Sequence, residues 1–132
     1  MRTRIKLCGM TRREDALAAA GAGADAIGLI FAPRSVRRLS LDAAQAIAVD
    51  LPPFLARVGL FMDQPASDVA ATLAAVPLEL LQFHGAEDDA YCAQFGRPFL
   101  KALPMASLAD VAGEMARFPR AAGFVLDAHA RG

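Results

Sequence analysis

Cysteine and histidine are scarce in this sequence, and their scarcity excludes several classes of function. Two cysteines and two histidines occur in 132 residues, and their spacing matches no zinc-binding pattern, so we expect no metal site. Two thiols make no disulfide framework, which is typical of a reducing cytoplasm. Lysine plus arginine equals aspartate plus glutamate, 14 against 14, so no basic excess favours a nucleic-acid partner.

Membrane-directed segments are also missing. Arg2 and Arg4 are followed by no apolar core, because Arg12 and Arg13 come too soon, so we expect neither a signal peptide nor a membrane span. No linker or low-complexity tract divides the chain. With 55% hydrophobic and 21% charged residues, it has the composition of a globular protein. Its length suits one domain, which we assign to residues 1–132.

Apolar strand-like segments alternate with alanine-rich helical segments. Each strand segment is nearly apolar on both faces, which favours a parallel sheet over an antiparallel one. Thr11, Ser40 and Ser107 are the expected helix N-caps, and the first helix should close at residues 21–23. The expected strands are residues 4–8, 26–31, 55–61, 78–83, 98–103 and 123–127, and the expected helices are about 12–22, 41–50, 66–75, 87–95 and 107–117.

Six strands and five helices in βα order are compatible with two architectures. An open doubly wound sheet is complete with five or six strands. A (β/α)₈ TIM-type barrel needs eight strands and roughly 200 residues or more. No helix follows the last expected strand, and residues 127–132 resemble a loop just opening. We therefore predict an α/β fold of the TIM-barrel type that is incomplete and lacks the last βα units.

Cys8 is the first candidate for chemistry, because it ends the first strand and active sites of α/β folds lie at carboxyl strand ends. Lys6 lies two residues earlier, on the same face of the strand. A nearby ammonium favours the reactive thiolate over the thiol. The alternative is a small buried hydrophobic side chain, which is the commoner fate of a free cysteine.

Asp127 is the second candidate, since it ends the buried strand at residues 124–126. It is either the N-cap of a following element or a general acid whose pKa is raised by apolar neighbours.

The loop at residues 33–38 contains Arg34, Arg37 and Arg38. A run of charges is usually a solvated surface, but at the carboxyl end of a strand a guanidinium can bind a carboxylate or phosphate through two hydrogen bonds.

Other polar residues in strands have competing interpretations. Gln82 and His84 share a face at the same rim; His84 is either a proton carrier or substrate donor, or a residue that supports the site from behind. Lys101 lies in an apolar strand, where a lysine is more often paired for structure than catalytic. Residues 21–26 match a dinucleotide-binding pattern, but they follow a helix and precede a strand, which is the wrong order for it. A thiol, a carboxylic acid and an arginine loop suit acid–base catalysis on a small anion.

An ordered set of segments resembles the phosphoribosylanthranilate isomerase family of tryptophan biosynthesis. The resemblance runs from residue 4 to the end of the chain. The segments are Ile5-Lys6-Leu7-Cys8-Gly9-Met10-Thr11, residues 23–31, residues 33–38, residues 51–53, Val58-Gly59-Leu60-Phe61, Leu81-Gln82-Phe83-His84-Gly85 and Val125-Leu126-Asp127.

The resemblance implies a cofactor-free Amadori rearrangement of N-(5-phosphoribosyl)anthranilate in the cytoplasm. Cys8 would be the general base, Asp127 the general acid and Arg37 the group that holds the anthranilate carboxylate, with His84 beside the substrate. The family continues beyond the sixth strand into a glycine-rich loop and a phosphate-binding set of backbone N–H groups, so we expect this chain to be an inactive fragment. The alternatives are a non-enzymatic open α/β module that binds a small anion, or another phosphate-sugar barrel enzyme.

Overall fold

One curved parallel sheet organises the computed structural model, which describes residues 1–129. The sheet has six strands in the order β1-β2-β3-β4-β5-β6, every neighbouring pair parallel. This sequential order is that of a barrel wall; it overturns the open-module alternative, in which β1 would lie inside the sheet. The strands are β1 (Lys6–Cys8), β2 (Ala26–Ile30), β3 (Ala56–Phe61), β4 (Leu80–Phe83), β5 (Phe99–Pro104) and β6 (Gly123–Asp127).

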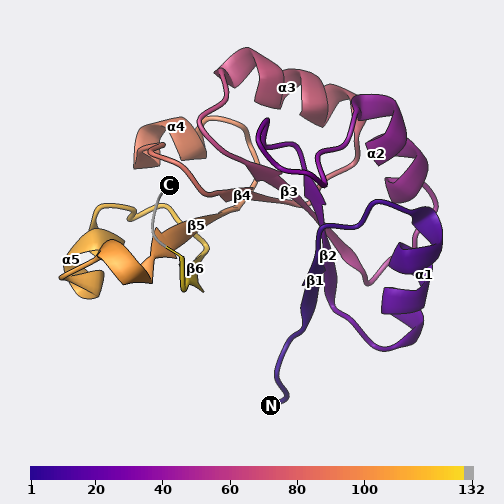
Figure 1. Ribbon diagram of the computed structural model, residues 1–132, viewed down its shortest axis with the longest axis horizontal. Coiled ribbons are helices and arrows are strands. Elements are labelled where there is room, and N and C mark those ends of the chain that lie inside the picture. Colours follow the sequence, from indigo (N-terminus) through magenta and orange to yellow (C-terminus); the bar gives the residue numbers. More distant parts are fainter. Residues whose placement is uncertain (130–132) are drawn as a thin grey trace.

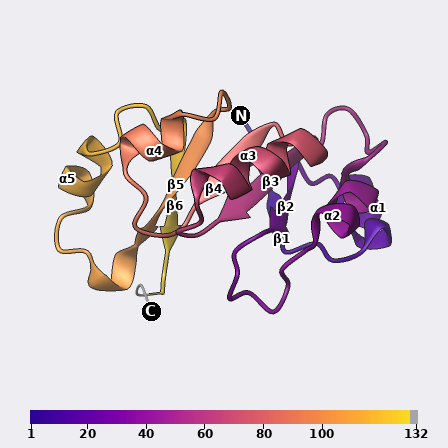
Figure 2. The same cartoon turned by 90° about the horizontal axis from the view of Figure 1, so that it is seen from above.

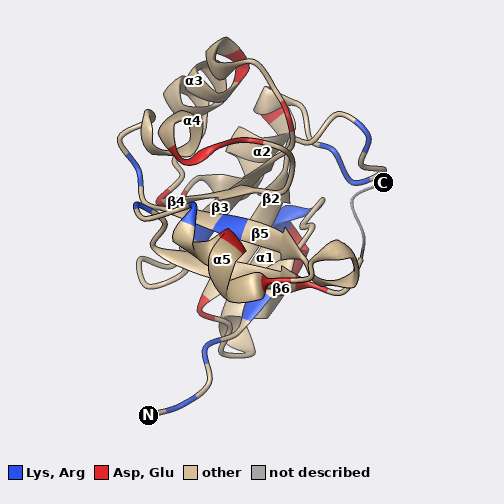
Figure 3. Ribbon diagram, turned by 90° about the vertical axis from the view of Figure 1, so that its left-hand side faces the viewer, with Lys and Arg blue, Asp and Glu red and all other residues tan. Residues whose placement is uncertain are grey.

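The helices follow one another around the outside of the curve, in chain order from α1 to α5 (Figures 1 and 2). Among the described residues, none of these helices is long and apolar enough to cross a membrane. Basic and acidic residues are mixed over the elements (Figure 3). The helices are α1 (Arg13–Gly21), α2 (Leu41–Ala48), α3 (Ala66–Ala75), α4 (Asp89–Ala93) and α5 (Val111–Ala116), and a 3₁₀ turn, η1 (Met105–Ser107), precedes α5.

The two faces of the sheet have different contents. Residues paired across parallel strands share a face, so the register separates an outer, helix-facing set from an inner, concave set. The outer face carries the main core, in which Leu29, Phe61 and Phe83 are almost fully buried. The inner face carries a small apolar cluster of Ile30, Val58 and Leu60. Polar strand residues on the inner face are therefore the ones free to meet a substrate.

The predicted strands and helices are confirmed, with differences at helix ends. Ser40 caps α2 as expected, since its side chain accepts from the Ala43 N–H. Thr11 is not the cap of α1, which begins after Arg12 and has no side-chain cap. Ser107 lies in η1 instead, and Asp110 caps α5 by accepting from the Gly113 N–H. Asp and Ser are equally good caps, so the pattern alone does not separate them.

The turn at residues 21–23 ends α1 with two hydrogen bonds that close a helix at a left-handed residue. The Gly23 N–H donates to the Ala20 carbonyl and the Ala24 N–H to the Ala19 carbonyl. Gly23 has φ +92°, a conformation that glycine adopts without steric strain. The glycines of the dinucleotide-like pattern thus form a helix C-cap, as their position between helix and strand predicts.

Lys101 is paired for structure, as expected. Its side chain is 0% exposed and lies on the outer face. Its ammonium donates to Glu87 at 3.0 Å and to the Gly85 carbonyl at 2.7 Å, and it lies 5.2 Å from the centre of the Phe118 ring. Glu87 also accepts from the backbone N–H groups of Asp63 and Gly85, so this buried pair fixes the loops that follow β3 and β4.

Candidate active site at the carboxyl ends of the strands

The Cys8 thiol occupies a space made for it on the inner face. Cys8 ends β1 and packs, half-buried, against the inner apolar cluster. It lies opposite Gly28 of β2, where an added Cβ would come within 2.6 Å of the sulfur. Gly28 is therefore a site residue that our sequence analysis did not single out. The signal was available, because a glycine inside an apolar strand often marks a close approach.

Arg37 is the arginine of the 33–38 loop that contacts the end of β1. Its guanidinium donates to the Cys8 carbonyl at 3.2 Å and lies against Gly9, where an added Cβ would overlap it at 2.1 Å. Gly9 has φ +82°, so two requirements, conformation and space, call for glycine there. Arg34 instead lines a pocket of about 270 Å³ with residues of the β3–α3 loop. Arg38 lies in a hollow beside α2 and α3.

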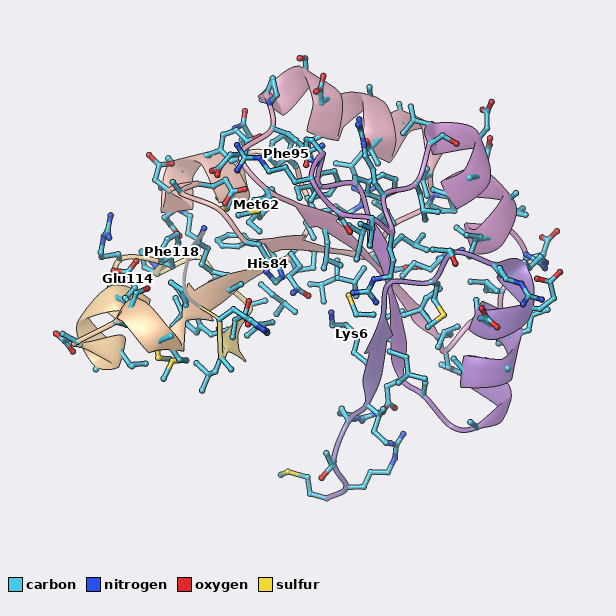
Figure 4. All side chains as sticks on the ribbon, viewed as in Figure 1. Lys6, Met62, His84, Phe95, Glu114 and Phe118 are labelled. Carbon is cyan, nitrogen blue, oxygen red and sulfur yellow. The ribbon has the colours of Figure 1, made fainter. Side chains whose placement is uncertain are left out.

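A chain of polar side chains crosses the inner face from β1 to β6. The Lys6 ammonium donates to Gln82 Oε1 at 2.7 Å, Gln82 Nε2 contacts His84 Nε2, and His84 Nδ1 lies 3.9 Å from Asp127 Oδ2. Figure 4 shows Lys6 and His84 extending into the space that the curve of the sheet surrounds. The sequence placed Gln82, His84 and Asp127 at this rim, and the structure adds the contacts that connect them to one another and to Lys6.

The pKa of Asp127 is shifted opposite to one of the two interpretations of its sequence, that of a general acid whose pKa is raised by apolar neighbours. Hydrogen bonds from the backbone N–H and the ring of His129 stabilise the carboxylate and lower the pKa of Asp127, while partial burial opposes them. The expected raised pKa is wrong for this structure because polar donors, rather than apolar neighbours, surround the carboxylate. The pKa of His84 is also lowered, chiefly by burial. The charge of Asp127 opposes this shift and that of Lys6 adds to it, and the net lowering favours the neutral imidazole near neutral pH.

Cys8 and Asp127 lie at the same end of the sheet, each at the carboxyl end of its strand. Their strands are the first and last in the order β1–β6. The sheet curls so that β1 and β6 lie on two sides of the space that it partly surrounds (Figure 1). Helices outside a curved parallel sheet, with titratable groups at the carboxyl ends of the strands, define the (β/α)₈-barrel class of enzymes.

Comparisons with known proteins narrow this class to one family. The family model described as N-(5'phosphoribosyl)anthranilate (PRA) isomerase matches residues 5–132. The chain therefore belongs to the PRA isomerase family. The curated relative from Pseudomonas aeruginosa is 50% identical over 129 residues, covering 98% of this chain and 61% of that protein. The relative from Neisseria gonorrhoeae is 48% identical over 126 residues, covering 96% and 61%.

Solved structures agree with the family match. The crystal structure of phosphoribosyl anthranilate isomerase from Thermus thermophilus superimposes with a TM-score of 0.81 at 41% identity, over 89% of this chain and 59% of that chain. Another was solved in complex with reduced 1-(o-carboxyphenylamino)-1-deoxyribulose 5-phosphate; its TM-score is 0.75 at 37% identity, over 78% and 54%. The chain thus spans about 61% of the length of the curated relatives it matches.

Proposed function

We propose that this chain carries the acid–base residues of an isomerase that converts N-(5'-phosphoribosyl)anthranilate to 1-(o-carboxyphenylamino)-1-deoxyribulose 5-phosphate in tryptophan biosynthesis. Family membership supports the reaction, and the observation that carries it is the presence of Cys8 and Asp127 at one rim of the same curved sheet. The relative solved with the reduced product analogue supports the substrate class, a small phosphorylated sugar attached to an aromatic acid.

In the proposed reaction, Asp127 gives a proton to the ring oxygen of the sugar. The bond between that oxygen and C1 breaks, and the nitrogen lone pair forms a Schiff base. The Cys8 thiolate then removes the proton from C2, and the electrons of that bond form an enolamine that tautomerises to the ketone. Arg37 binds the anthranilate carboxylate through its guanidinium. Side chains supply every proton transfer, so the proposal includes no cofactor.

The lowered pKa of Asp127 affects its proposed role. A carboxylate that is stabilised by His129 is a strong acid once protonated, but few molecules carry the proton at neutral pH. A substrate that displaces water from the carboxylate raises this fraction, because desolvation disfavours the charged form. Asp127 therefore becomes an effective acid in the bound complex rather than in the free protein.

We further propose that residues 1–132 form the first five βα units and the sixth strand of one barrel domain and are inactive without the remaining units. The chain covers 61% of the length of the Pseudomonas aeruginosa relative, which supports this proposal. So does the position of β1 and β6 at the two edges of the sheet, where neither has a second neighbouring strand among the described residues. The phosphate of the substrate would bind to the remaining units. The free thiols of Cys8 and Cys92 are consistent with a location in the cytoplasm.

A chimera tests these proposals. In it, residues 1–132 are joined to the remaining carboxyl-terminal part of the Pseudomonas aeruginosa relative; we call it the extended chain. We expect the extended chain to convert the anthranilate substrate and to restore growth without tryptophan to a bacterium that lacks the isomerase. The 132-residue chain alone should do neither. Turnover by the 132-residue chain at the rate of the extended chain would refute the fragment proposal, and a folded but inactive extended chain would refute the isomerase proposal.

A further inference from the structure

The proposed reaction leaves two polar residues of the inner face without a task. Gln82 is only 2% exposed, and both polar atoms of its amide have partners. Its Oε1 contacts Lys6 and its Nε2 contacts His84. Lys6 is half-buried and also directs its ammonium to the inner face. Burying polar groups is unfavourable unless each finds a partner, so the arrangement of donors and acceptors at Gln82 is the feature to explain.

The direction of the hydrogen bonds follows from chemistry alone. A lysine ammonium has donors and no acceptor, so the atom 2.7 Å from it must be the amide oxygen of Gln82. The amide nitrogen then faces His84 Nε2, and an amide NH₂ can only donate. His84 Nε2 must therefore present its lone pair, and the single proton of the neutral ring must be on Nδ1. If the Gln82 amide were rotated by 180°, its NH₂ group would face the Lys6 ammonium, and both groups are donors.

The proton on Nδ1 faces Asp127. His84 Nδ1 lies 3.9 Å from Asp127 Oδ2, while Oδ1 of the same carboxylate accepts from His129. His84 is the residue through which the β4 side chains reach β6, since its ring lies between Gln82 and Asp127. The first two links of the series are hydrogen bonds. The third, from His84 Nδ1 to Asp127 Oδ2, is an electrostatic contact at 3.9 Å.

We propose that Lys6 and Gln82 are positioning residues that fix the His84 imidazole in the Nδ1–H tautomer and so aim a hydrogen-bond donor at Asp127. This inference rests on the proposed function for its catalytic consequence. When Asp127 gives its proton to the ring oxygen of the sugar, a carboxylate remains. The His84 Nδ1–H, whose nitrogen lies 3.9 Å from Oδ2, then stabilises that charge electrostatically without giving up its own proton. The free imidazole prefers the other tautomer in water, so the amide of Gln82 makes the difference.

Nitrogen-15 NMR of the 132-residue chain tests the tautomer without any need for activity. The chain has two histidines, so a His129→Asn background leaves His84 as the single imidazole. In this background we expect a protonated Nδ1 and an unprotonated Nε2. Gln82→Glu replaces the amide donor with an acceptor of the same shape, which still pairs with Lys6, so Nε2 should acquire a proton. Lys6→Met frees the amide to turn and should give a mixture of tautomers.

Asp127→Ala is the matched control at the other end of the series. If Gln82 sets the tautomer, His84 keeps its proton on Nδ1 after the carboxylate is removed. The proposal is overturned by a protonated Nε2 in the His129→Asn background, by an unprotonated Nε2 in Gln82→Glu, or by a change of tautomer in Asp127→Ala. If Gln82→Glu fails to fold, the first and third measurements still decide the question.

Kinetics of the extended chain give the second measurement. Gln82→Glu should lower kcat by about 10-fold, less than the roughly 10²- to 10⁴-fold contribution of a general acid or base itself. It should leave KM within about 2-fold, because Gln82 is only 2% exposed. A rise in KM with an unchanged kcat would contradict a positioning role. An inactive extended chain would refute the proposed function alone, since the NMR result stands independently of it.

Discussion

Lys6 and Lys101 both interrupt apolar strands, but they lie on opposite faces of the sheet. Lys101 points outward beneath the helices, is 0% exposed and is paired with Glu87, whose other oxygen bonds to loop backbone. Lys6 points inward, is half-buried and bonds to a neutral amide that leads to titratable residues. The comparison teaches that the face of a strand, rather than the residue type, separates polar groups that hold the fold from polar groups available for chemistry.

The strongest test of this division removes the proposed acid and base from the inner face. Cys8→Ser and Asp127→Asn in the extended chain should each lower kcat by roughly 10²- to 10⁴-fold, the usual contribution of a general acid or base. Both side chains are partly exposed, so thermal unfolding of either variant should differ little from that of the parent. If both variants keep most of the parent kcat, the acid–base assignment is wrong.

On the outer face, Lys101→Met should chiefly affect stability. Removing one member of a buried ion pair leaves an uncompensated charge on Glu87 and costs about 3–5 kcal/mol of unfolding free energy, measured by urea denaturation. Adding Glu87→Gln removes that charge and should recover much of the loss. Lys6→Met is the matched change on the inner face. It removes one hydrogen bond to Gln82 and should cost about 1 kcal/mol. Equal losses for the two lysine variants would break the comparison.

Gly28→Ala tests how tightly the inner face is fitted around the thiol. The added methyl would lie 2.6 Å from the Cys8 sulfur and 3.2 Å from Leu60, so we expect a loss of about 1–3 kcal/mol in stability and a displaced sulfur with lower kcat in the extended chain. Gly21→Ala is the control, because a Cβ there meets nothing within 4 Å. Equal stability of the two variants would show that the inner face adapts to the methyl.

Asp25 should give the smallest effect, through pH. Hydrogen bonds from Arg2 and the Ile5 N–H lower the pKa of Asp25. A folded-state pKa below the unfolded one means that the unfolded chain binds the extra proton in acid. The contribution of Asp25 to stability is therefore present above roughly pH 3.9, the unfolded value, and is lost as the pH falls through the lowered pKa. Urea midpoints measured from about pH 6 to about pH 3 should fall less steeply for Asp25→Asn than for the parent.

Sequence patterns predicted the elements of this fold better than the details of its site. Apolar strands and alanine-rich helices repeat at βα spacing, so the strands at residues 26–30 and 123–127 were expected almost to the residue. The cap Ser107 was wrong because local propensity does not distinguish it from Asp110, which caps α5. The cap Thr11 was wrong because α1 begins one residue later and has no side-chain cap. The pKa of Asp127 depends on His129, which follows it by two residues in a loop whose path the sequence does not specify.

The contacts of the site required the three-dimensional arrangement. The sequence placed Lys6 and Cys8 on one face, but Lys6 donates to Gln82, which is 76 residues away along the chain. The choice of Arg37 among three arginines came from family resemblance and stays a prediction; in the structure its guanidinium donates to the Cys8 carbonyl. Contacts between distant strands depend on register and curvature, which periodicity does not encode.

The contact of the Arg37 guanidinium with Gly9 has a consequence for substrate specificity. The guanidinium donates to the backbone carbonyl of the residue that carries the thiol, so this hydrogen bond sets the position of the guanidinium relative to the thiol. Under the proposed roles, the guanidinium binds the anthranilate carboxylate while the thiol contacts C2 of the sugar. The distance between the two groups must therefore match the distance between these two parts of the substrate. An analogue whose carboxylate is moved from the ortho to the para position of the ring could not bind Arg37 and place C2 beside Cys8 at the same time.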